Sequence, residues 1–298
     1  MNLIAVIGDP VLDQIYHSSD PVMPHGKMLG RFFGSVPGGT TANFACAAAR
    51  FGLEVQMIGR VADTWEGALH RDALTDFGVN TDGLRAEEVA RGAHTVIIIG
   101  PDGEKTLVYV PFPLPASVDP ALLQGHDMVY VMAADFDRIA PHLSGVTAEI
   151  CVDADAAAGL SAEDFARVAA SANVVFLNET GFRKLTGGDP DPENVAALLD
   201  QGPSLVCCTG GAGITYVATR DASGQVACIH RPALPAQVVD TTGAGDCFNA
   251  AFLARRALGD SLADALDFAM AAGALATEVT GAREAIPTVQ AVEGRLVP

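Results

Sequence analysis

The chain has 298 residues, of which 49% are hydrophobic and 18% charged, so it is long and apolar enough to bury a large core, which excludes a disordered protein. With 18 Lys and Arg against 36 Asp and Glu, the net charge is −18, which argues against a nucleic acid as partner. Six cysteines without a C-x-x-C pair, no signal peptide and no apolar run of membrane-spanning length predict a cytoplasmic protein that does not enter membranes.

The N-terminal segment predicts a buried strand with a ligand-binding residue beyond its end. Leu3–Ile7 is a short apolar run that ends in Gly8-Asp9-Pro10, as is typical of a central strand. Asp13 follows this strand on the side where open α/β sheets bind their ligands. A turn residue is the alternative for Asp13, and we treat it as a candidate ligand.

Two segments, residues 14–37 and 92–111, lack helical periodicity and predict short strands. In the second segment, two β-type runs flank Gly100–Glu104, which indicates a hairpin.

Between the two segments, Gly38 and Gly39 precede a predicted helix over residues 41–51. The glycines allow the backbone to approach a ligand, and the amide of Asn43 offers a donor and acceptors to a polyol. A helix-capping pair is the alternative.

The middle of the chain alternates between strand and helix patterns. Sequential βα units predict a mostly parallel sheet with helices on both faces. The sequence predicts these elements: strands at 128–132, 150–152, 174–177 and 205–208, and helices at 136–143 and 162–171. Asp153 and Asp155 close one strand and are open candidates for a ligand. The turn 209–213 leads into a predicted hairpin over 214–218 and 226–230, and because no helix follows its glycines, it is not a dinucleotide fingerprint.

The segment from Asp240 to Phe252 reads D-T-T-G-A-G-D-C-F-N-A-A-F and predicts a loop that leads into a helix. Gly243, Ala244 and Gly245 leave the backbone N–H groups at the helix start open to an anion. Asp246 stands at the same end, where an N-cap is the plain interpretation. Capping alone does not explain the Gly-Ala-Gly turn or the second carboxylate, Asp240. The pattern favours an anion cradle beside a carboxylate base, as phosphoryl transfer to a hydroxyl requires. Further helices are predicted at 245–258, at 262–279 and after Pro287.

These residues resemble a known family. D-T-T-G-A-G-D at 240–246 and G-G-T-T-A-N at 38–43 are similar to the two signatures of the ribokinase-like (PfkB) carbohydrate kinases, and the likeness extends from Gly8 to Pro287. It implies one α/β domain over residues 1–298 with a ribokinase-like three-layer fold, in which segments 14–37 and 92–111 form a small β-sheet lid. It also implies that ATP, with Mg²⁺, phosphorylates a hydroxyl on a sugar or sugar-like substrate.

The resemblance assigns roles to individual residues. Asp246 would be the general base, with Gly243, Ala244 and Gly245 around the transferring phosphoryl group. The substrate would be bound by Asp13, Gly38, Gly39 and Asn43. The nucleotide would lie near Asn178, Cys208, Thr209, Gly210, Met270 and Gly273. A monovalent cation, K⁺, would bind near Asp240, Thr242, Gly281 and Ala285.

The chain also departs from the family pattern. Thr40 stands where ribokinases have Lys, Gly181 where relatives have Glu, Cys208 where Thr is usual, and Ala285 where Ser is frequent. These departures leave open a non-catalytic sugar or nucleotide sensor. Because Gly8–Asp13 also resembles the opening of adenosine kinases, a nucleoside kinase is a second alternative. The expected partners are a small-molecule sugar or nucleoside and a second copy of the chain bound through the lid.

Overall fold

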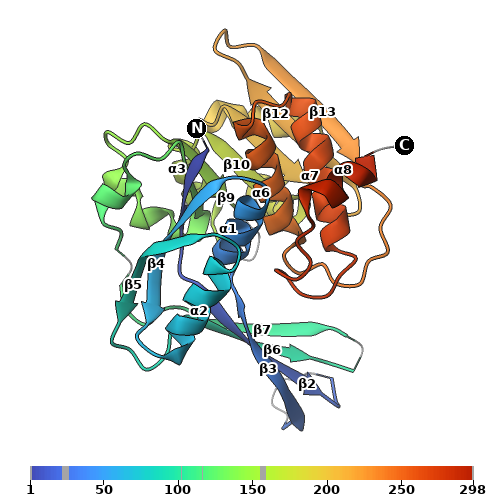
Figure 1. The fold of residues 1–298 in the computed structure, drawn as a ribbon. Helices are drawn as coiled ribbons and strands as arrows, with labels where there is room; N and C mark the ends of the chain where they lie inside the picture. Colours follow the sequence, from blue (N-terminus) through green and yellow to red (C-terminus); the bar gives the residue numbers. More distant parts are fainter. Residues whose placement is uncertain (1, 22–26, 102, 116, 155–158, 297–298) are drawn as a thin grey trace.

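A computed structural model describes residues 2–21, 27–101, 103–115, 117–154 and 159–296 of the chain. It shows a central sheet with helices on both faces and a smaller sheet that projects from one end (Figure 1). The predicted three-layer α/β fold is therefore confirmed. Residues 22–26 of the expected lid, Asp102 of the expected hairpin and Asp155 lie outside the described residues.

The large sheet has nine strands in the order β13-β12-β11-β10-β9-β8-β1-β4-β5. Neighbours from β11 through β5 pair in parallel, and β12 and β13 continue the sheet antiparallel. The inner strands are continuous apolar runs because both faces of the sheet are covered. The strands are β1 Leu3–Ile7, β4 Glu54–Ala62, β5 Asn80–Glu87, β8 Met128–Met132, β9 Glu149–Asp153, β10 Val174–Asn178, β11 Leu205–Thr209, β12 Ile214–Arg220 and β13 Val226–Pro232.

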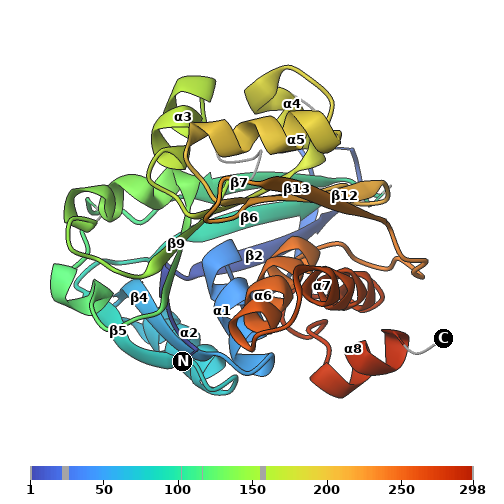
Figure 2. The same cartoon turned by 90° about the horizontal axis from the view of Figure 1, so that it is seen from above.

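Helices α1, α2, α6, α7 and α8 cover one face of this sheet, and α3, α4 and α5 cover the other (Figure 2). Within the described residues, no helix is both long and apolar enough to cross a membrane. The helices are α1 Thr40–Arg50, α2 Trp65–Thr75, α3 Ala162–Ala169, α4 Glu179–Thr186, α5 Pro192–Ala197, α6 Ala244–Ala257, α7 Leu262–Ala276 and α8 Val289–Leu296.

Two predicted helices differ from the structure. The helix expected at 136–143 is replaced by two short 3₁₀ segments, Ala133–Arg138 and Ala140–His142. Pro141 explains the break, since it has no N–H and its ring clashes with a continuing α-helix. Helix α6 begins at Ala244, so Asp246 lies in its first turn and is not its N-cap, which is Gly243.

The small sheet is built from the two segments for which the sequence predicts short strands, and we refer to it as the lid. Its order is β3-β2-β6-β7, with β2 Val11–Ser18, β3 Gly30–Gly38, β6 His94–Ile99 and β7 Lys105–Val110. Strand β2 starts only a few residues after the end of β1, and β3 leads directly into α1. The lid is therefore joined to the main body at the carboxyl edge of the large sheet, where ligands of such sheets bind (Figure 1).

A buried ion cluster fixes this junction. Asp9, just after β1, accepts hydrogen bonds from Arg60 Nη2 and Arg138 Nη2, both at 2.6 Å. Arg60 also donates to the carbonyls of Leu114 and Pro115, at 2.6 and 2.7 Å, on the segment that returns from the lid. Burial would raise the pKa of Asp9, but the hydrogen bonds and charges of the two arginines hold it below its ordinary value. The cluster ties four remote segments together.

We expect Asp9→Asn to lower the free energy of unfolding by about 3–5 kcal/mol, because the change leaves the buried guanidinium group of Arg60 without its counter-charge and Arg138 with only that of Asp135. Because the pKa of Asp9 is depressed in the folded chain, its stabilisation is complete above about pH 4 and is lost as the pH falls through the folded pKa. Urea unfolding of the wild type and of Asp9→Asn as a function of pH measures both the loss of stability and its pH dependence. The exposed Asp82→Asn is the control, and an equal loss in both variants would contradict the prediction.

Candidate active site

The N-terminus of α6 presents open backbone next to a tight turn. Gly243 is the N-cap and has a φ of 76°, in the left-handed region that favours glycine. A Cβ at Gly243 would lie 2.8 Å from the Cβ of Ala282, so the turn packs against the 281–285 loop. Gly245 is exposed, and nothing lies within 4 Å of the position that its Cβ would take. An anion can therefore approach the first turn of the helix closely.

Asp246, in this first turn, contacts the other glycine motif. Asn43 Nδ2, in the first turn of α1, donates a hydrogen bond to Asp246 Oδ2 at 3.2 Å. The two residues are 203 positions apart in the sequence. The two motifs that the sequence singled out therefore converge in the fold.

Asp13 approaches the same place from the lid. It lies on β2, and its Oδ2 occupies the space that a Cβ on Gly38 would fill. Burial raises the pKa of Asp13, and a hydrogen bond from Thr95 and the charge of Arg283 only partly oppose this. Gly39, the N-cap of α1, has a φ of 96° and brings the backbone close to the start of β2, which carries Asp13. The four predicted substrate residues are thus neighbours, and one of them, Asn43, contacts Asp246.

Asp240 joins the loop before α6 to two other parts of the fold. Its carboxylate accepts hydrogen bonds from Thr242 N at 3.1 Å, Thr242 Oγ1 at 2.6 Å and Gly281 N at 3.1 Å. Lys105 Nζ, at the start of lid strand β7, donates to Asp240 Oδ1 at 3.1 Å and to Thr242 Oγ1 at 3.0 Å. Although burial opposes it, these hydrogen bonds hold the pKa of Asp240 well below its usual range. A lid cation therefore lies beside the turn that precedes α6.

The residues expected around a monovalent cation are brought together, but their side chains offer little to it. The Asp240 carboxylate is already occupied by Gly281 N and Thr242, and Ala285 is a buried apolar side chain. Only carbonyl oxygens from these segments could be ligands. Among the described residues no cluster of three or more His, Cys, Asp or Glu suits a metal ion. Glu179, near the position of the missing family Glu, pairs with Arg183 at 2.6 Å.

The expected nucleotide-binding residues come from the ends of β10 and β11 and from α7. Asn178 is the N-cap of α4 and accepts a hydrogen bond from Gly181 N at 2.7 Å. Cys208 is wrong as a side-chain ligand: it has no exposed surface because its strand directs it into the apolar core, and burial raises its pKa to about 12. The neighbouring Thr209 is partly exposed and is the hydroxyl that remains available, while Gly210 is buried in the turn.

Helix α7 brings two of the expected nucleotide-binding residues, Gly273 and Met270, close to α6. A Cβ on Gly273 would lie 3.5 Å from Phe248 Cβ and 3.6 Å from the Ala244 carbonyl oxygen, so this glycine allows the helices to approach each other. Met270 packs in the core between the helices and is 9% exposed. Only a small part of its surface can face a ligand.

Asp153, the open candidate at the end of β9, is part of a buried polar network. Its Oδ2 accepts hydrogen bonds from Tyr130 Oη at 2.8 Å and from Asn249 Nδ2 at 3.0 Å. Tyr130 stacks on Phe44 with ring centroids 3.5 Å apart. These contacts place Asp153 in the core beneath α6, where it supports the helix that carries Asp246.

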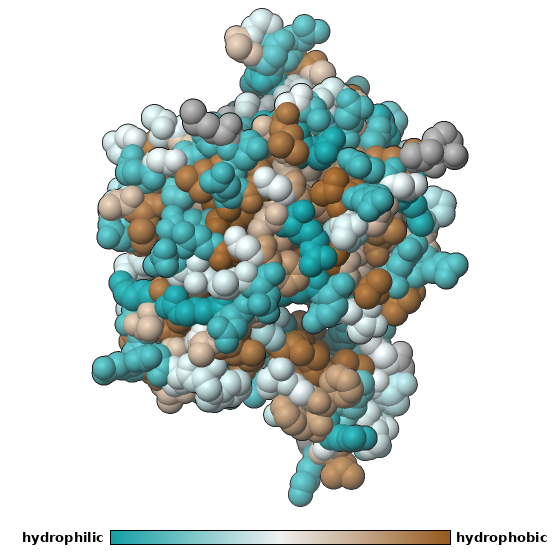
Figure 3. All heavy atoms as spheres, viewed as in Figure 1, coloured by the Kyte–Doolittle hydropathy of each residue, from teal (hydrophilic) through white to brown (hydrophobic). Residues whose placement is uncertain are grey.

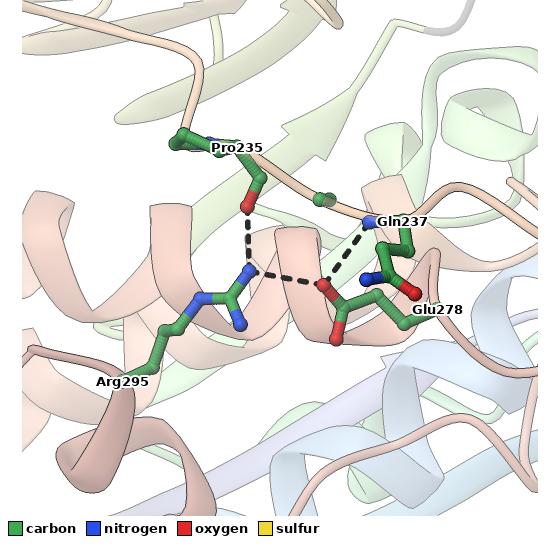
Figure 4. A pocket seen from close by; sticks show the side chains of 5 residues that line it. Pro235, Gln237, Glu278 and Arg295 are labelled. Carbon is green, nitrogen blue, oxygen red and sulfur yellow. Dashed lines mark hydrogen bonds and ion pairs between the residues drawn. The ribbon is translucent and has the colours of Figure 1, made fainter.

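A separate cavity of about 460 Å³ lies near the C-terminus, lined by Pro235, Ala236, Gln237, Glu278 and Arg295. Figure 4 shows that Arg295 bridges the Pro235 carbonyl and Glu278, which also accepts from Gln237 N at 3.2 Å. The polar groups of this cavity thus satisfy one another. None of the candidate catalytic or substrate residues lines it, so it is not the candidate active site.

Comparison with known proteins decides the family. The model of the pfkB family of carbohydrate kinases matches residues 1–289. The chain belongs to this family. Its PfkB relatives include fructokinase-2 of Oryza sativa subsp. japonica, 30% identical over 327 residues, covering 97% of this chain and 92% of that protein. The ribokinase of Bacillus subtilis (strain 168) is 30% identical over 306 residues, covering 98% of this chain and 99% of that protein.

Solved structures agree on the fold of this PfkB chain. The structure of Arabidopsis thaliana ribokinase complexed with ribose and ATP superposes with a TM-score of 0.86, covering 99% of this chain and 98% of that one. The sequences are only 23% identical, so this likeness supports the fold alone.

Sequence reasoning missed two side chains at the site, Lys105 and Arg283. Lys105 is one of three lysines and follows the hairpin turn of the lid. Arg283 lies in the loop for which the sequence predicted only a role near a monovalent cation, at Gly281 and Ala285. For both residues, the sequence pattern that could have indicated a role is a single cationic side chain close to a glycine-containing turn. The contacts themselves join residues 135 and 240 positions apart.

Proposed function

We propose that this PfkB kinase uses ATP and Mg²⁺ to phosphorylate a hydroxyl of a sugar or sugar-like substrate, with Asp246 as general base. The observation that carries the proposal is the contact between Asn43 and Asp246, which sets the base beside the predicted substrate residues. Asp13, Gly39 and Asn43 orient the acceptor, and the Asp246 carboxylate takes the proton of the attacking hydroxyl as its bond to phosphorus forms. The surface between them is polar enough to satisfy several hydroxyl groups.

The transferring phosphoryl group is held by backbone and by one lid cation. The first-turn amides of α6 and the positive end of its dipole face the space above Gly245. Lys105 Nζ, next to the same turn, adds a full charge that a triphosphate would attract away from Asp240.

Metal ions complete the proposal. A structure from E. coli with ATP and Mg²⁺ has the same fold, with a TM-score of 0.83 and 20% identity. Mg²⁺, when bound, neutralises charge between the phosphates, and phosphate oxygens and water are sufficient ligands for it. A K⁺ ion near Gly281 would have only carbonyl ligands from this chain, so we propose at most a modest stimulation of turnover by K⁺.

An acceptor screen tests the proposed function. ATP consumption is measured with fructose, ribose, 2-keto-3-deoxygluconate, adenosine and pseudouridine, each with and without K⁺. Turnover with a sugar supports the proposal, and turnover with adenosine or pseudouridine alone supports the nucleoside kinase. Binding of these compounds without ATP turnover would instead indicate a sensor.

We expect Asp246→Asn to keep substrate binding but to lower kcat by several orders of magnitude, because an amide cannot accept the proton of the hydroxyl. Asp264→Asn is the matched control, since Asp264 occupies the same first-turn position of α7 and is exposed. Steady-state kinetics with the best acceptor and calorimetric binding measure both effects. Turnover of Asp246→Asn close to that of the control would disprove the role as base.

We expect Lys105→Met to lower kcat/KM for ATP on the order of 10- to 100-fold, because it removes the lid cation next to the phosphoryl group. KM for the acceptor should change much less. Lys184→Met, on the exposed surface of α4, is the control and should behave like the wild type. A normal kcat/KM for ATP in Lys105→Met would show that the lysine serves only as a contact to Asp240.

We also propose that two copies of the chain associate through their lids. The lid exposes apolar side chains along both of its edge strands, β3 and β7, and just before β3: Leu29, Phe32, Phe33, Leu107, Val108 and Tyr109. Figure 3 shows hydrophobic surface on this part of the molecule. Such a surface on a small exposed sheet is typical of an interface.

Light scattering should therefore give twice the mass of the 30.7 kDa chain. We expect Phe33→Glu to produce a monomer, because Phe33 is 71% exposed and a charge there would be buried in the interface. Leu258→Glu, an equally apolar exposed site at the end of α6, should leave the mass unchanged. A monomeric wild-type chain would refute the association.

A further inference from the structure

Arg283 is a buried cation inside the candidate site. It is 5% exposed and lies in the 281–285 loop, behind the turn that precedes α6. A guanidinium group in such a place needs hydrogen-bond partners to offset the loss of water. Its Nε donates to Asn43 Oδ1 at 3.1 Å and its Nη2 to the Gly38 carbonyl at 3.0 Å. Both partners belong to the glycine motif that leads into α1.

The contact to Asn43 determines which way the amide of Asn43 points. Arg283 can only donate hydrogen bonds, and an ionised Asp246 can only accept them. The amide is satisfied on both sides only if Oδ1 faces Arg283 and Nδ2 faces Asp246, as the structure has it. With Arg283 removed, the amide could turn over or leave the base.

Charge adds to this geometry. Burial lowers the pKa of Arg283, while the charges of Cys46, Glu284, Asp13 and Asp246 oppose this, and a guanidinium group stays protonated in either case. Carboxylates from its own loop, from the lid and from α6 therefore act on one buried cation. This cation favours the ionised form of Asp246, the form that accepts a proton.

We propose that Arg283 is a positioning residue for phosphoryl transfer, which through Asn43 orients the carboxylate of Asp246 and through the Gly38 carbonyl holds the substrate-binding turn against the start of α6. This inference rests on the proposed kinase function. It gives the 281–285 loop a role through a side chain, in addition to any role of its carbonyls.

The central test is Arg283→Met, which keeps the length and apolar stem of the side chain but removes its charge and donors. We expect kcat to fall on the order of 10- to 100-fold, with KM for ATP within about threefold of the wild type. Arg50→Met is the matched control: Arg50 donates to the Ile286 carbonyl, next to the same loop, but contacts neither Asn43 nor Asp246. It should keep the wild-type kcat. A kcat of Arg283→Met within twofold of the control would overturn the proposal.

A double-mutant cycle separates positioning from general stability. If Arg283 acts through Asn43, the combined loss of kcat in Arg283→Met with Asn43→Ala should be clearly smaller than the product of the two single losses. Fully multiplicative losses would show that Arg283 acts independently of Asn43 and would overturn the proposal. If Arg283→Met does not fold, Arg283→Lys takes its place, since Lys keeps the charge but cannot hold both acceptors in a planar fork.

The pH profile gives a second readout that a merely structural residue would not change. The groups whose charge acts together with Asp246 include Arg283, Tyr130 on β8 and Cys247 on α6. Burial raises the pKa of both Tyr130 and Cys247, so these two stay neutral near pH 7. Without Arg283 the ionised carboxylate loses its counter-charge, so the acid limb of kcat/KM should move to higher pH in Arg283→Met.

An unshifted limb in a folded variant would count against the proposal. The two proposals fail in different ways. No phosphoryl transfer by the wild-type chain to any acceptor would remove the proposed function. Normal wild-type turnover together with a fully active Arg283→Met would remove only the role of Arg283.

Discussion

The site depends on the contact between Asn43 and Asp246, which closes a loop of 203 residues. No local preference of the chain produces this contact. It exists because α1 and α6 pack side by side on one face of the sheet, through small buried residues such as Ala45, Ala47 and Ala251 (Figure 2). Their Gly-preceded N-termini then face the same edge of the sheet. The packing of two apolar helix faces thus positions two polar first turns.

The positive charge at this edge of the sheet is opposite in sign to the net charge of the chain. The chain carries a net charge of −18, yet the proposed reaction requires it to bind a triphosphate. Backbone amides at the start of α6 resolve this conflict because they bind anions without any cationic side chain. The two cations nearby, Lys105 and Arg283, are each held by carboxylates, by the contact with Asp240 and by the charges of Asp13 and Asp246. The positive charge is local, and the surrounding acidic surface can remain.

The sequence predicted the parts of this site that are local and failed where long-range packing decides. The two glycine motifs and the buried strands follow from short patterns, and the structure contains them. Cys208 was wrong as a side-chain ligand because both faces of β11 are covered, so that only Thr209 at the end of the strand is partly exposed. The helix at 136–143 was wrong because its apolar pattern was given more weight than Pro141. Lys105 and Arg283 were missed because their partners are fixed only by the fold.

The lid has a consequence for how acceptor preference could diverge among related chains. Its strands come from residues 11–38 and 94–110, whereas the phosphoryl-binding turn and the base come from 240–246. Apart from Asp13, Gly38, Thr95 and Lys105, the lid residues can therefore change without altering the residues to which we assign the transfer. Selection could thus produce kinases with new substrates by exchanging these two stretches, while the remainder of the gene stays under constraint.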